Sequence, residues 1–115
     1  MQYLALIYSS PASGPTYGSA EFGKMMEDYN KFTAMLKDKG AFLGGEGLKP
    51  AASATSIRVR AGKVETMDGP FAETKEHLGG YYLMNVPDLD TAMKYAAMIP
   101  TAVWGTVELR PVMEY

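Results

Sequence analysis

The chain has 115 residues, 47% of them hydrophobic and 21% charged, with a net charge of −2 and no cysteine. This length and composition predict a single globular domain over residues 1–115. The slight acidity argues against a nucleic-acid or anionic-membrane partner, and the lack of cysteine excludes disulfides, thiolate nucleophiles and zinc–sulfur sites. No apolar run is long enough to span a membrane and the first residues resemble a strand rather than an export signal, so we expect a cytoplasmic protein.

The first predicted element is a strand over residues 2–8. Its side chains alternate between two apolar faces, one with Leu4, Leu6 and Tyr8 and the other with Tyr3, Ala5 and Ile7. Two apolar faces indicate a central strand that is covered on both sides. Residues 9–18, rich in serine, proline and glycine, are predicted to form a loop.

An amphipathic helix is predicted over residues 20–39. Its apolar side chains are spaced three or four residues apart, as Phe22, Met25, Tyr29, Phe32 and Leu36. Ser19 is a suitable N-cap, and Gly40 is a suitable left-handed stop.

The middle of the chain is predicted to be mostly strands. Residues 41–48 form a short strand in which Gly44-Gly45 indicates a bulge. Residues 55–60 and 63–67 form a hairpin around a tight Ala61-Gly62 turn. Asp68-Gly69-Pro70 ends the hairpin, and residues 71–78 form a charged connector with room for one helical turn.

The last third predicts a strand, a helix and a strand. Residues 80–86 are apolar on both faces, with Tyr82 and Met84 opposite Tyr81 and Leu83. The helix begins after Asp88, ends before Pro100 and has a predicted buried stripe of Leu89, Ala92, Met93, Ala96 and Ala97. In the final strand, residues 106–112, Val107 and Leu109 oppose a polar face of Thr106, Glu108 and Arg110.

This order of elements predicts an α+β, ferredoxin-like fold: two helices on one face of a mainly antiparallel sheet, with an added hairpin. Two helices cover only one sheet face, yet the first strand and the strand near Tyr82 are apolar on both. We therefore expect a homodimer in which a second copy covers the other face. The alternative is a monomer whose loop 9–18 covers it.

Residues 68–76 read DGPFAETKE and are followed by Leu78-Gly79-Gly80-Tyr81-Tyr82. This long segment resembles the YCII-related family, in the branch named for its DGPF signature. Further similarity covers nearly the whole chain, including the first strand, the Gly44–Leu48 segment, Val59-Arg60 and the C-terminal Arg110-Pro111-Val112. The resemblance implies a dimeric α/β barrel, made of two ferredoxin-like subunits packed sheet to sheet.

The resemblance implies less about chemistry. Most members of this branch have no assigned reaction, some wider relatives resemble muconolactone-isomerase-type enzymes, and a few are lyases with a His–Asp pair. Those relatives carry a histidine at or near the first helix, whereas the only histidine here is His77, so that mechanism does not transfer. Genes of this branch often lie beside those of extracytoplasmic-function sigma factors, so the resemblance also implies a possible regulatory partner of that kind.

Charged side chains gather in the signature segment, where Asp68, Glu73, Lys75, Glu76 and His77 lie within ten residues. A carboxylate beside a cation can act as a general acid or base, so Asp68 and Glu73 are candidate catalytic residues and Lys75 and His77 candidate ligand contacts. The alternatives are a turn-forming role for Asp68, salt bridges for Glu73 and Lys75, and a plain surface position for His77.

Further candidates are predicted on the sheet face that the helices leave uncovered. Arg58, Arg60, Glu108 and Arg110 are expected at its edges, where Arg60 and Arg110 could hold a carboxylate. The alternative for these arginines is inter-subunit salt bridges with Glu108 and Glu46. Tyr8 and Tyr81 could orient a ligand through their hydroxyls or simply pack their rings. The nine methionines are interpreted as core residues.

Two functions remain open at this point. The first is binding of a small anionic organic molecule in a dimer pocket, extended in an enzyme to cofactor-independent isomerisation or elimination. Asp68 or Glu73 would then be the base, Arg110 or Lys75 would hold the substrate's charge, and loop 9–18 would be the lid. The second is a non-catalytic regulatory or interaction module that acts through a sigma-factor partner. Neither function requires a cofactor or a metal.

Overall fold

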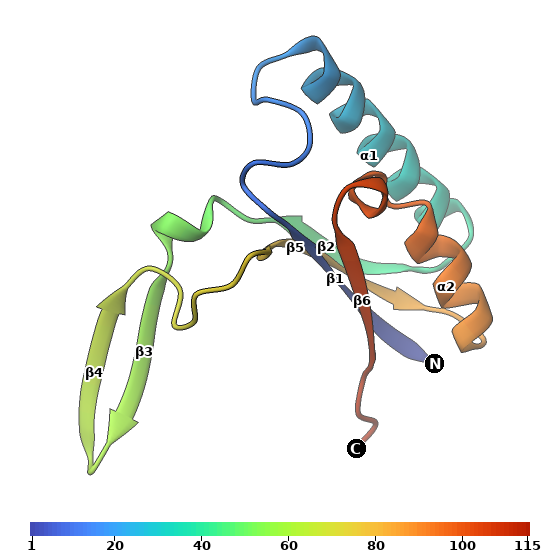
Figure 1. The fold of residues 1–115 in the computed structure, drawn as a ribbon. Helices are drawn as coiled ribbons and strands as arrows, with labels where there is room; N and C mark the ends of the chain where they lie inside the picture. The colour runs from blue at the N-terminus through green and yellow to red at the C-terminus, as the bar shows by residue number, and fades with distance from the viewer.

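The computed structural model describes all 115 residues (Figure 1). Six strands and two α-helices follow one another in an order close to that predicted from the sequence. Their bounds, with those of two short 3-10 helices, are β1 Gln2–Ser9, α1 Ala20–Asp38, β2 Phe42–Gly47, η1 Ala51–Ser53, β3 Thr55–Arg60, β4 Lys63–Asp68, β5 His77–Asn85, α2 Leu89–Ala97, η2 Pro100–Val103 and β6 Thr106–Pro111.

The main sheet has the strand order β2-β5-β1-β6, and every neighbouring pair is antiparallel. Both helices lie on the same side of this sheet (Figure 1). This is the ferredoxin-like α+β arrangement predicted above. The expected bulge in β2 is present as a register shift between Phe42 and Gly44.

Local capping fixes where the helices begin and end. At the start of α1, Ser19 Oγ accepts a hydrogen bond of 3.1 Å from the Phe22 amide, and after its end Gly40 takes a left-handed φ of 69°. At the start of α2, Asp88 Oδ1 accepts one of 2.8 Å from the Thr91 amide. All three predicted signals are therefore used.

The core lies between the helices and the sheet. Tyr3, Ala5 and Ile7 of β1 are buried there, in a cluster with Phe32 and Leu36 of α1. The ring of Tyr82, from β5, meets that of Phe32 edge to face, with centroids 5.1 Å apart. The predicted assignment of the two β1 faces is therefore confirmed.

The opposite face of the sheet, here called the bare face, has no helix over it (Figure 1). Directly paired residues share a face, and the register joins Leu4 to Leu83 and Leu6 to Tyr81. These side chains, with Tyr8, are only partly buried in the single chain. Glu108 and Arg110 flank them on β6, where they form a 3.3 Å ion pair.

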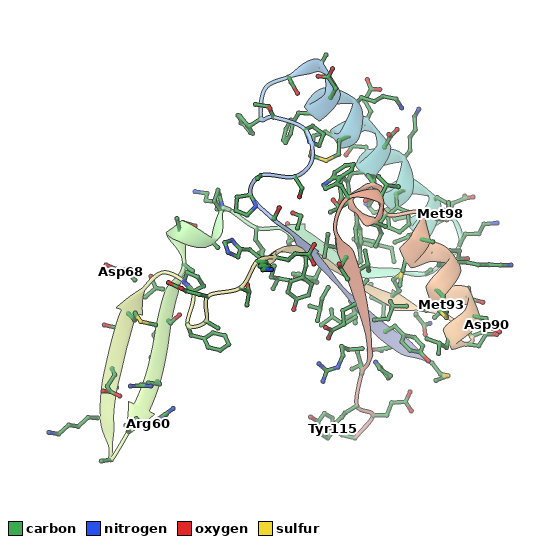
Figure 2. All side chains as sticks on the ribbon, viewed as in Figure 1. Arg60, Asp68, Asp90, Met93, Met98 and Tyr115 are labelled. Atoms are coloured by element: carbon green, nitrogen blue, oxygen red, sulfur yellow. The ribbon has the colours of Figure 1, made fainter.

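The predicted buried stripe of α2 is only partly correct. Ala92 and Ala96 are buried, but Ala97 is exposed, and Leu89 and Met93 are 48% and 54% exposed. The helix instead turns Tyr95 toward the core. Met98, directly after the end of α2, is also 54% exposed, and Figure 2 labels both methionines.

The β3–β4 hairpin forms a sheet of its own. The prediction that Arg58 and Arg60 lie at the edge of the bare face is therefore wrong. Arg58 instead pairs with Glu65 across the hairpin at 2.9 Å. The connector after the hairpin contains bends but no helical turn, and β5 begins earlier than predicted, at His77. Neither α-helix is long and apolar enough to cross a membrane.

Candidate functional site

Three glycines leave part of the helix-covered sheet face without side chains. Gly47 pairs with Gly80, which pairs with Ile7, and Gly45 pairs with Tyr82. Because Ile7 and Tyr82 point toward the helices, the three glycine positions face the same way. We call them the glycine floor.

Above the glycine floor is a cavity of about 480 Å³, bordered by the N-terminal half of α1. This volume is in the range of small-molecule sites. The helix side chains that line this cavity are ones that the sequence predicts to lie in the core. They line a cavity instead, because no strand side chain rises from the glycine floor to meet them. The apolar lining comprises Ile7, Phe22, Met25, Met26, Tyr29, Phe42, Leu48, Tyr81 and Tyr82.

The physical reason for glycine differs among the three positions of the floor. A Cβ at Gly45 would lie 2.8 Å from the Tyr82 ring, and one at Gly80 would lie 2.9 Å from the Glu46 carbonyl oxygen, so both positions are too crowded for a side chain. At Gly47 a Cβ would meet no atom within 4 Å, and φ is not left-handed. Packing therefore does not require glycine at position 47, whereas an open cavity does.

Two hydroxyl pairs are among the polar groups of this cavity, which also include Ser9 and Asn30. Tyr29 Oη lies 2.5 Å from Thr101 Oγ1, and Tyr82 Oη lies 2.8 Å from Thr33 Oγ1. Burial is the main cause that raises the pKa of both tyrosines above the ordinary value. Both tyrosines are therefore protonated at neutral pH. In this state their hydroxyls can orient a ligand by hydrogen bonds but do not serve as bases.

A second cavity, of about 620 Å³, adjoins the first. The two share Ser9, Phe22, Gly47, Leu48 and Gly79, so they lie side by side and are called the joined cavities below. The second cavity is bordered by the loop after β1, through Ser10, Pro11 and Tyr17, and by Lys49 and His77. The Tyr17 ring packs on Phe22 with centroids 4.9 Å apart, which attaches this loop to the start of α1.

The charges around the joined cavities are unevenly placed. Lys49 and His77 border the second cavity. The one charged residue bordering the first is Glu46, and its pairing with Tyr81 turns its side chain toward the bare face. The space therefore has an apolar inner end and an outer end that favours negative charge. No three His, Asp or Glu side chains gather in a way that could hold a metal ion.

Of the site residues predicted from sequence, His77 borders the second cavity. Tyr81 borders the first, but its pairing with Leu6 places its side chain on the bare face, away from the glycine floor. Glu73 and Lys75 lie exposed in the connector between β4 and β5, outside both cavities. Their side chains form no salt bridge within the chain, and the Asp68 carboxylate makes no hydrogen bond there. Figure 2 shows Arg60 at the tip of the hairpin and Asp68 at its base.

Tyr8 and Arg110 belong to the bare face, where Arg110 pairs with Leu4 and Tyr8 pairs with Leu78, the residue after His77. Thr106, the β6 partner of Tyr8, also donates a hydrogen bond of 2.9 Å from its Oγ1 to Glu76. Sequence reasoning missed Phe22, Met25, Tyr29 and the glycine floor as site residues. The available signal was the alternate spacing of Gly45 and Gly47 in one strand, which removes side chains from a single face.

Comparison with known proteins supports the similarity noted in the sequence. The YCII-related domain matches residues 1–115. An uncharacterized protein of Rhizobium meliloti (strain 1021) is 32% identical over 117 residues, covering 100% of this chain and 94% of the relative. The chain belongs to the YCII-related domain family.

Proposed function

We propose that the protein binds a small organic molecule with an apolar body and one anionic group in the joined cavities. The observation that carries this proposal is the cavity above the glycine floor, which is apolar and contains two oriented hydroxyl pairs. Such a combination is typical of small-molecule sites. Lys49 and His77 at the outer end would attract the anionic group.

Binding is better supported than catalysis. Proton transfer in a cofactor-independent isomerase or lyase needs a base within reach of the bound molecule. The expected carboxylates, Asp68 and Glu73, border neither cavity of the single chain, whereas His77 borders the outer one. We therefore propose His77, rather than either carboxylate, as the acid–base group of any reaction at this site.

The experiment compares phenylpropionate with its neutral amide, phenylpropionamide, by calorimetric titration. We expect the carboxylate to bind about tenfold more tightly, because a charge-assisted contact is worth about 1.5 kcal/mol or more. Lys49→Met should remove most of this preference, while Lys94→Met, which changes an exposed lysine of α2, should keep it. Failure of both compounds and of longer alkyl carboxylates to bind would refute the proposal.

We also propose that the protein is a homodimer in which a second copy covers the bare face. Leu4, Leu6 and Leu83 remain partly exposed in the centre of that face. An apolar patch of this kind is usually an interaction surface. A two-fold axis would place each bare face against the other and would pair the same surface with itself.

A further inference from the structure

The β3–β4 hairpin carries an apolar face that no part of the chain covers. Val59 pairs with Val64, and Ile57 lies on the same face. These three side chains are 57%, 69% and 68% exposed in that order. The opposite hairpin face bears the Arg58–Glu65 ion pair and Met67.

Such a hairpin is not expected to be stable by itself. A two-stranded hairpin in water is marginal at best, because it buries little apolar surface. Every residue of β4 is exposed, and neither β3 nor β4 pairs with a strand of the main sheet. The apolar face therefore needs a cover from outside the chain.

The accessible surface of the whole chain indicates how much area a partner would bury. Its accessible surface is 8188 Å², whereas a compact monomer of 12.5 kDa would have about 6,200 Å². The excess of about 2,000 Å² is in the range that each subunit of a permanent dimer buries. The radius of gyration agrees, since it is 15.9 Å against about 13 Å for a compact domain of this length.

The position of the hairpin indicates which molecule contacts its apolar face. Figure 1 shows α1 and α2 on one side of the main sheet and the hairpin projecting to the other, which is the side of the bare face. A second copy that lies on the bare face is therefore flanked by the hairpin. By symmetry, its own hairpin flanks the first copy.

We propose that the hairpin is a dimerisation arm, whose face of Ile57, Val59 and Val64 packs against the second copy. This inference rests on the homodimer proposed above and extends it beyond the sheet-to-sheet contact. The arm explains why alternating apolar residues are placed in a hairpin that contributes nothing to the core of its own chain.

The test compares two lysine substitutions in the same strand, Val64→Lys on the apolar face and Met67→Lys on the opposite face, by sedimentation equilibrium. Val64→Lys should raise the dimer dissociation constant more than about tenfold, because a charge is then buried in the interface. Met67→Lys adds the same charge and should change it less than about threefold. Hydrogen exchange on the wild-type dimer should show protected β3 and β4 amides, which dissociation exposes.

The outcomes separate the two proposals. A wild-type dimer that tolerates Val64→Lys and exchanges its hairpin amides freely would overturn the arm and leave the dimer intact. A wild-type monomer at micromolar concentration would overturn both. Circular dichroism of each variant checks that the main sheet and helices remain folded.

Discussion

Gly47→Leu is expected to lower the affinity for phenylpropionate by more than about a hundredfold. Gly47 lies on the glycine floor and borders both cavities, so a leucine side chain occupies the volume that the ligand needs. The folded structure should tolerate the change, because a Cβ there meets no atom within 4 Å. Titration calorimetry measures the affinity, and thermal unfolding measures the stability.

Gly23→Leu is the matched control, since it adds the same side chain at an exposed position of α1 where a Cβ also meets no atom within 4 Å. Gly23 does not border the cavities, and this variant should bind phenylpropionate like the wild type. Equal binding by all three proteins would place the ligand elsewhere. Gly80 is unsuitable for this test, because a Cβ there would collide with the Glu46 backbone.

Leu36→Ala should lower the free energy of unfolding by about 3 kcal/mol and the melting temperature by about 10 °C. Leu36 is 0% exposed and packs in the single core cluster between α1 and the sheet. Removing its branched end leaves a cavity that the neighbouring β1 and β5 side chains cannot fill without moving. Urea unfolding followed by circular dichroism measures the loss.

Leu89→Ala provides the comparison, because it makes the same change in the other helix. Leu89 is 48% exposed, so its loss should cost less than about 1 kcal/mol. A loss at Leu89 as large as that at Leu36 would mean that α2 packs with the face predicted from the sequence, and would contradict the orientation described here.

The fold was largely predictable because its signals are local. The alternation in β1, the stripe from Phe22 to Leu36 and the Ala61-Gly62 turn each determine an element through its own residues. The orientation of α2 was not predictable in this way. Ala92 and Ala96 fit a stripe with Leu89 and Met93 equally well as one with Tyr95, and packing against the rest of the fold selects Tyr95.

The site was less predictable, because a cavity is a property of several segments together. The sequence drew attention to the charged residues 68–77, but of these only His77 borders the joined cavities. Gly47 and Gly80 are distant in sequence and become neighbours only through the β2–β5 pairing. The predicted position of Arg60 was wrong for a related reason. Alternating side chains predict a hairpin, but they do not predict which sheet the hairpin joins.

The proposed function requires that a ligand binds between α1 and the glycine floor. Its most direct test is an amide chemical-shift titration of the uniformly labelled protein with phenylpropionate. We predict that the largest shift changes occur at Gly45, Gly47, Gly79 and Gly80, because their amides border the occupied space. Changes confined to Leu4 and Leu6 of the bare face, or to the β3–β4 hairpin, would contradict the claim.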